Sequence, residues 1–255
     1  MRPGLRIMVG TLVAALLAAG IAAPAAAGEP AEPSEPSVPP VAFTLGARAS
    51  VAFPMGSVSS DPATGPLLID ELVALSIPLQ LDAGVTLSGR WFVGAYVQYG
   101  WNVLQVGQCK VGESCSLTGL RVGVQALFSL HDQGDTPWAG IGTGYEWLFT
   151  RYSRTGVTTT LDVSGWEFVN LQAGYDVVVS PGWKLGPWIS GSVGEFSRAN
   201  LKYDGRTSDQ NIPNKAVHGW FQMGVKGSFG PGAGTAAALH STAGGGSANP
   251  DGRPP

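Results

Sequence analysis

Few side chains of this 255-residue chain have the type and spacing that chemistry requires, and a serine–histidine pair is the first to consider. Ser129 and His131 are two positions apart, so on a strand both would lie on one face. A histidine beside a serine can act as the general base that activates the hydroxyl for hydrolysis of an ester. Whether this pair could meet a substrate depends on which face of the strand carries it.

Three glycines at alternate positions, Gly140, Gly142 and Gly144, resemble a nucleotide-binding loop at first sight. That loop needs the spacing G-x-G-x-x-G after a strand and before a helix, because the helix N-terminus holds the phosphates. Here the spacing differs and no helical pattern follows. Glycines at every second position share one face of a strand, where they permit close packing. We therefore expect no nucleotide and no other cofactor.

The two cysteines of the chain, Cys109 and Cys115, are separated by five residues. A metal site is the sharper interpretation, but no histidine lies nearby and two thiolates alone do not fill a tetrahedral shell. In an oxidising compartment such a pair is typical of a local disulfide. A closure this short would stabilise the fold by about 2 kcal/mol. We expect the disulfide and no metal.

Six charged residues stand inside segments that otherwise alternate between apolar and small polar residues. They are Arg48, Asp82, Arg121, Glu146, Asp176 and Lys226. No catalytic motif joins them, so their meaning depends on the elements that position them. Two further acids, Glu167 and Glu195, fall on the apolar face of their segments and are expected at strand ends.

The N-terminus has the layout of a cleavable secretory signal. Arg2 and Arg6 precede an apolar run over 7–23, and alanines at 25–27 come before a polar stretch. We expect a signal peptide over 1–27, with an uncleaved membrane anchor as the alternative. A Pro/Glu-rich periplasmic spacer follows over 28–41 and a disordered Gly/Ala-rich tail is expected over 230–255, which leaves one folded domain over 42–229.

The composition restricts the class of protein. Charged residues are only 13% of the chain, glycine reaches 37 residues, and 15 basic residues stand against 18 acidic ones without any basic run. Nucleic acid is therefore excluded as an expected partner. After the N-terminal run, no stretch approaches the ~20 apolar residues that a spanning helix needs. If the mature chain crosses a bilayer, it must cross as strands.

Period-two alternation is the main structural signal of the domain. Over 90–103 one face is apolar and carries aromatic residues at both ends, Trp91 at one and Tyr99 and Trp101 at the other. The same alternation appears in seven further segments, and Trp147 and Phe149 close the apolar face of one of them. An apolar band flanked by aromatic girdles is typical of a membrane-spanning barrel. We predict eight strands.

The charges fall on the opposite face. All six charged residues named above share the Gly/Ser/Gln-rich face, and the central positions of the apolar face carry none. A basic residue facing lipid near the midplane costs about 2–4 kcal/mol, whereas inside a barrel it can pair. The pattern therefore predicts an interior network of buried charges. A soluble ligand-binding barrel would require the reverse arrangement, with an apolar interior.

The connections alternate in length. Tight or short links are expected at Ser88-Gly89, at 131–136 and at 180–182, and long ones at 54–76, 104–116, 151–164 and 199–216. All short turns then lie at one end with both termini. This is the topology of an all-β, eight-stranded antiparallel up-and-down transmembrane β-barrel, with periplasmic turns and extracellular loops.

In strand number, alternation and loop asymmetry, the chain resembles the small OmpA/OmpX-type bacterial outer-membrane β-barrel proteins over roughly 42–229. The resemblance implies residence in the outer membrane of a Gram-negative bacterium, contact with its lipid, and assembly by the outer-membrane insertion machinery. That machinery reads an aromatic residue at the end of the last strand, and Phe229 ends the segment Gly219–Phe229. One departure is the tail that follows Phe229.

For function we expect a non-enzymatic envelope protein that is structural or presents its extracellular loops to an external partner. A porin-like conduit for small solutes or hydrophobic compounds is the alternative, although eight strands enclose an interior that side chains just fill. A lipid-modifying enzyme is the third class. Some barrels similar to this one hydrolyse lipid with a Ser/His pair facing the bilayer, but Ser129 and His131 lie on the predicted interior face.

Overall fold

The computed structural model of this chain describes residues 41–61, 65–105, 107, 109, 112–154, 157–203, 206–212 and 214–230. The expected signal peptide, nearly all of the spacer and nearly all of the C-terminal tail lie outside the described residues. Within those residues, no helix is both long and apolar enough to cross a membrane.

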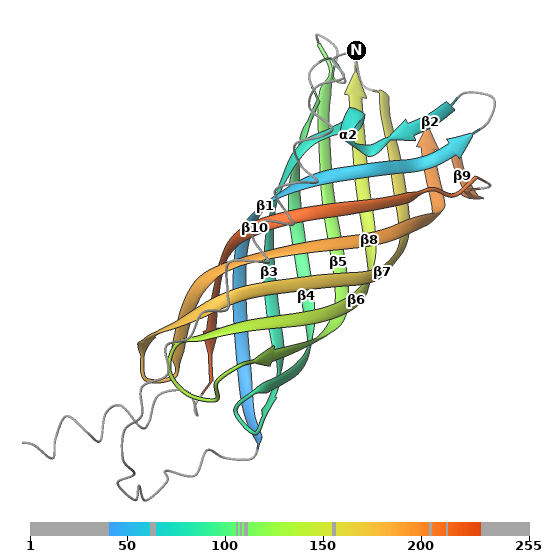
Figure 1. The fold of residues 1–255 in the computed structure, drawn as a ribbon. Helices are drawn as coiled ribbons and strands as arrows, with labels where there is room; N and C mark the ends of the chain where they lie inside the picture. Colours follow the sequence, from blue (N-terminus) through green and yellow to red (C-terminus); the bar gives the residue numbers. More distant parts are fainter. Residues whose placement is uncertain are drawn as a thin grey trace, which may run out of the picture. The chain divides into compact units, whose positions relative to one another are not determined.

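Eight long strands close into one antiparallel ring, as expected from the sequence. Neighbours along the chain pair with one another, and the ring closes where β10 pairs with both β1 and β8. Figure 1 shows β10 lying between these two strands. The long strands are β1 Val41–Asp61, β3 Val73–Leu87, β4 Trp91–Leu104, β5 Ser114–Ser129, β6 Thr136–Arg154, β7 Val157–Ser180, β8 Trp183–Tyr203 and β10 Val217–Phe229.

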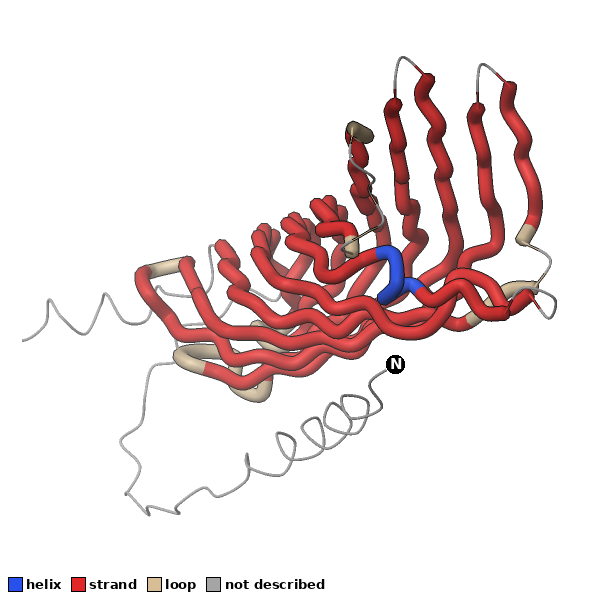
Figure 2. Tube along the Cα trace, turned by 90° about the horizontal axis from the view of Figure 1, so that it is seen from above, coloured by secondary structure: helices blue, strands red, loops and turns tan. Residues whose placement is uncertain are grey.

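Three short elements complete the described chain. They are β2 Gly65–Leu68, which pairs with β1, α2 Ile69–Leu72, and β9 Arg206–Asn211, which pairs with β8. In Figure 2 nearly all of the described chain is drawn as strand, and the short helix is α2. All three elements belong to connections at the end of the barrel opposite the tight turns, called here the loop end.

Tight turns join the strands at the other end, called here the turn end. Between β3 and β4, Ser88 and Gly89 both adopt positive φ, 49° and 68°, and the Arg90 amide donates to the Leu87 carbonyl at 3.1 Å. Consecutive positive φ values twist the chain in the sense that suits a two-stranded hairpin. Gly182, with φ 81°, is the positive-φ residue of the turn between β7 and β8.

Three of the connections expected to be long loops are instead mostly strand. Of the predicted loop over 54–76, the described residues belong to β1, β2, α2 and β3. Of the predicted loop over 151–164, all described residues belong to β6 or β7, which pair up to Arg154 opposite Val157. The predicted loop over 199–216 contains the end of β8 and all of β9. The segments 151–164 and 199–216 are polar on the outward face, so the apolar alternation used to detect strands ends before the strands themselves do.

A β-bulge in β7 corrects one expectation. The register of β7 against β8 shifts between Glu167 and Val169, and its register against β6 shifts between Gly142 and Gly144. Odd-numbered residues face inward before the bulge and even-numbered residues after it, because the extra residue reverses the alternation. Glu167 is therefore only 1% exposed and faces the interior, not the apolar face to which strict alternation assigned it.

The two faces of the barrel wall have opposite character over most of its length. Charged and amide side chains are buried inside, whereas large apolar side chains remain exposed outside. The exposed residues near mid-strand include Leu81, Val97, Val124, Ile141, Leu171 and Val225.

At the loop end the polarity of the wall is reversed. A cluster of buried apolar residues fills the interior there, while the outward side chains become polar, as at Arg151 and Lys202. Ile69 of α2 enters this cluster and is fully buried. The other buried members are Ala52, Val58, Val73, Leu117, Leu148, Val163, Phe196, Ile212 and Trp220.

Candidate functional site

The interior charges lie in two layers, and the layer nearer the turn end is centred on Arg48. Its Nε donates to Asp82 at 2.7 Å, and its two terminal nitrogens donate to Gln172 and Gln125. The guanidinium also lies 5.0 Å from the ring centre of Trp188. These four partners are all buried, so the charge of Arg48 is compensated within the barrel rather than by solvent.

Lys226 completes this first layer. Its ammonium donates to Asp176 at 2.8 Å and lies 4.5 Å from the ring centre of Trp138. The Trp138 indole nitrogen donates to the second oxygen of Asp176 at 2.9 Å. The carboxylate therefore accepts on both oxygens, which is the arrangement that a buried ion pair requires.

The second layer, nearer the loop end, is centred on Arg121. It pairs with Glu146 at 2.8 Å and with Glu167 at 3.2 Å. Glu167 also accepts from the Tyr96 hydroxyl at 2.6 Å, and Glu146 is in contact with Nε2 of His218. All of these side chains are at least nine-tenths buried.

Amide side chains extend the first layer. Gln80 donates to Asp82, Gln98 donates to both Gln80 and Gln222, and Gln222 accepts from Ser50. Neutral amides can both donate and accept, so they extend a buried network without adding charge.

The structure thus places all six predicted charges in the interior and joins each to a partner. Sequence reasoning missed Glu167, His218, Tyr96 and the glutamines as members. The glutamines could have been found, because they share the inward face of their strands with the charges. The inward position of Glu167 could not have been predicted from the alternation, because it depends on the bulge in β7.

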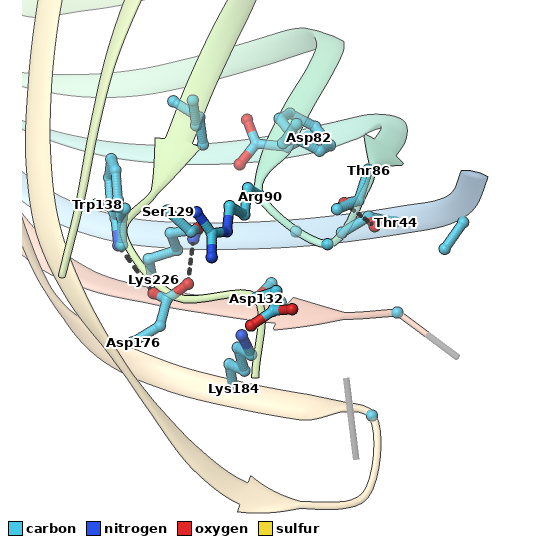
Figure 3. Close-up of a pocket in the computed structure, with 18 residues that line it drawn as sticks. Thr44, Asp82, Thr86, Arg90, Ser129, Asp132, Trp138, Asp176, Lys184 and Lys226 are labelled. Carbon is cyan, nitrogen blue, oxygen red and sulfur yellow. Dashed lines mark hydrogen bonds and ion pairs between the residues drawn. The ribbon is translucent and has the colours of Figure 1, made fainter. Parts of the chain in front are cut away.

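A cavity of about 90 Å³ opens at the turn end, beside the first layer. Its floor is formed by Asp82, Trp138, Asp176 and Lys226. Figure 3 shows these residues together with Arg90, Ser129, Asp132 and Lys184, which line the rest of it. A smaller cavity of about 30 Å³ lies beside Arg121 and Glu146 in the second layer.

Aromatic side chains form bands near both ends of the outer face. At the turn end, Trp91 contacts Phe128 and Trp183 contacts Phe229, with ring centres 4.8 and 5.0 Å apart. Toward the loop end, Tyr99 contacts Trp101, and Tyr145 contacts both Trp147 and Trp166. Phe149 is exposed on the same face.

The remaining candidate residues lie apart from the interior network. Cys109 and Cys115 form the expected disulfide, with Cα atoms 5.9 Å apart, in the connection between β4 and β5. Ser129 lines the turn-end cavity, whereas His131 is exposed and its backbone amide donates to the Thr136 hydroxyl. Within the described part of the chain, no group of three or more histidine, cysteine or acidic residues is arranged to hold a metal ion.

No protein-family model matches the chain, and no curated protein matches it in sequence. Similar solved structures include Neisserial surface protein A, with a TM-score of 0.41 at 15% identity, covering 72% of this chain and 95% of that one. A major outer membrane protein from Thermus thermophilus has a TM-score of 0.46 at 12% identity, covering 74% and 99%. Outer membrane protein AlkL, in lipid bilayers, has a TM-score of 0.48 at 11% identity, covering 80% and 97%. Likeness at this level concerns the fold and not activity or partners.

Proposed function

We propose that this chain is a non-enzymatic β-barrel protein of the outer membrane of a Gram-negative bacterium, which presents its loop end to the exterior. One observation carries the proposal: the barrel wall is apolar outside and charged inside. In water this arrangement would expose a continuous apolar band, whereas soluble monomers rarely expose more than a few hundred Å² of contiguous apolar surface. In lipid the same band is buried and the charges are shielded.

The closed ring supports the membrane part of the proposal. A strand edge in lipid would leave backbone amides and carbonyls without partners, at a cost of several kcal/mol each. Because β1 pairs with β10 and β10 with β8, the ring leaves no such edge over the apolar band. The aromatic bands at its two ends match the two interfaces of a bilayer.

The proposed orientation of the barrel in the membrane follows from the different lengths of the connections at its two ends. Short turns are typical of the periplasmic side of such barrels and longer connections of the outside. The disulfide between Cys109 and Cys115 at the loop end suits an oxidising exterior. The loop end carries β2, α2, β9 and the ends of β6, β7 and β8, so these elements would form the surface that meets an external partner.

The absence of enzymatic activity is part of the proposal. Arg48, Arg121 and Lys226 are each engaged with buried carboxylates, an arrangement that suits a structural network better than a reactive group. Incubation of the folded protein with labelled outer-membrane lipid should leave the lipid unchanged over hours. Release of fatty acid that depends on Ser129 would instead identify a lipid hydrolase.

The deciding experiment is fractionation combined with heat-modifiability. The outer-membrane fraction is separated on SDS gels with and without boiling. We expect a faster-migrating band in the unboiled sample, because a closed barrel resists SDS at room temperature. Recovery of the chain in the soluble periplasmic fraction, with no mobility difference, would refute the membrane proposal and favour a soluble binding protein.

A second candidate function, a conduit for hydrophobic compounds, is favoured by the apolar cluster at the loop end. Ile69 and Leu72 of α2 cover an interior lined by Leu117, Leu148 and Phe196. An apolar molecule displacing α2 would find an apolar interior, but the charged layers below would have to rearrange. Proteoliposomes test it: uptake of a hydrocarbon-soluble dye faster than in empty liposomes would support the conduit.

A further inference from the structure

The turn-end cavity has a pair of cations that the fold itself does not use. Arg90 comes from the turn between β3 and β4, and Lys184 faces inward from the start of β8. Both line the cavity, and neither side chain makes an ion pair or hydrogen bond with another described residue. In Figure 3 the two lie on either side of Asp132.

The charges on the cavity floor are already compensated. Asp82 accepts from Arg48, Gln80 and Gln125, and Asp176 accepts from Lys226 and Trp138. These carboxylates therefore do not neutralise Arg90 or Lys184. Among the described residues, the Lys226 ammonium donates one hydrogen bond, to Asp176, although an ammonium carries three donors, so it can donate further into the cavity.

One acidic residue opposes the two cations at the rim. Asp132 is exposed, lies in the connection between β5 and β6, and makes no ion pair with another described residue. Asp132 lies close to the β3–β4 turn, since a Cβ atom added at Gly89 would lie 2.9 Å from the Cβ of Asp132. The balance of unpaired charge around the cavity is therefore positive.

We propose that this cavity binds a small solute through an oxyanion that Arg90 and Lys184 attract from the cavity wall, with Ser129 as an additional hydroxyl donor. A guanidinium binds a carboxylate or phosphate with two parallel hydrogen bonds, and an ammonium adds a point charge. The volume of about 90 Å³ suits a group of the size of a phosphate or a small carboxylate. The proposal does not depend on the function proposed for the loop end.

The test is calorimetric titration of the full-length folded protein in a maltoside detergent, which has no phosphate headgroup. Inorganic phosphate and acetate are titrated separately, which distinguishes a phosphate from a carboxylate site. We expect saturable binding of at least one of them. Arg90→Gln and Lys184→Gln should each weaken it about tenfold, as expected for the loss of one charge-assisted hydrogen bond.

Two matched variants make the result decisive. Asp132→Asn removes the opposing carboxylate and should tighten binding severalfold, a gain that a damaged fold cannot produce. Lys202→Gln removes an exposed cation at the loop end and should leave binding unchanged. Heat-modifiability of every variant verifies that the barrel is folded.

Absence of saturable binding of both anions by the unaltered protein would overturn the proposal. Equal weakening by Lys184→Gln and Lys202→Gln would also overturn it, because the binding would then reflect net charge alone. Binding that appears only when phospholipid is added to the micelles, and that needs Arg90, would assign the oxyanion to a lipid headgroup instead of a free solute.

Discussion

At the scale of single residues, the barrel interior depends on paired charges. Arg121 lies between Glu146 and Glu167, and His218 and Tyr96 complete the shell around these carboxylates. Removing one partner from such a network leaves another charge buried without compensation. Removal of one buried charge should therefore lower the stability of the barrel more than removal of an exposed charge.

Arg121→Leu tests this dependence. We expect the free energy of unfolding to fall by about 3–5 kcal/mol, because two buried carboxylates lose their cation. Urea unfolding of the refolded protein in lipid vesicles measures it. Arg151→Leu, at an exposed position on β6, is the control and should change the free energy by less than about 0.5 kcal/mol.

The outer face provides the complementary prediction. Val97 is 43% exposed near the middle of β4, within the apolar band. Val97→Arg should destabilise the barrel in vesicles by about 2–4 kcal/mol, because the charge would face lipid. Thr207→Arg on the exposed strand β9 should have almost no effect. Equal effects of the two substitutions would contradict a lipid-facing band.

At the scale of elements, the strands were predictable wherever their two faces differ in polarity. Strict alternation identified all eight long strands and their order, because one face of each is apolar. The alternation did not predict that β6 and β7 continue beyond the aromatic band, because both faces contain polar residues there, such as Thr158 and Ser153. It also misplaced Glu167, since a bulge inserts one residue and reverses the alternation without any sequence signal.

Short elements were not predictable because their stability comes from the barrel. Helix α2 has only four residues, too few to be stable alone, and the buried side chain of Ile69 holds it. Ile69→Ala should cost about 2–5 kcal/mol if the site does not collapse. Protease cleavage within 65–72 should then become faster, whereas Leu67→Ala, at a position 41% exposed, should leave the rate unchanged.

At the scale of the whole molecule, assembly should depend on the end of the last strand. Phe229 ends β10 and contacts Trp183 of β8 at the turn end. The family resemblance implies that the insertion machinery reads this aromatic residue. Phe229→Ala should lower the amount of heat-modifiable protein in the outer membrane severalfold, while Phe221→Ala in the same strand should not. Immunoblotting of boiled and unboiled membranes measures both.

The barrel and its closure were predictable from the sequence, and so was the burial of the six charges. The turn-end cavity was not, because it is formed by residues from five or more connections and strands that approach one another only after closure. The reversal of polarity at the loop end was also missed. It requires knowing how far each strand continues past the lipid.

The continuous pairing of β6 with β7 has a consequence for the external partner proposed for the loop end. The ladder runs from the turn end to Arg154 and Val157 and shifts register between Gly142 and Gly144, so the described ends of the hairpin are held by strand pairing without a partner. A ligand that docks on such a rigid template immobilises few backbone torsions, and the entropic penalty of association is correspondingly small. Selection among partners would then depend on shape and side-chain identity at the tips, which can diverge without disturbing the scaffold beneath them.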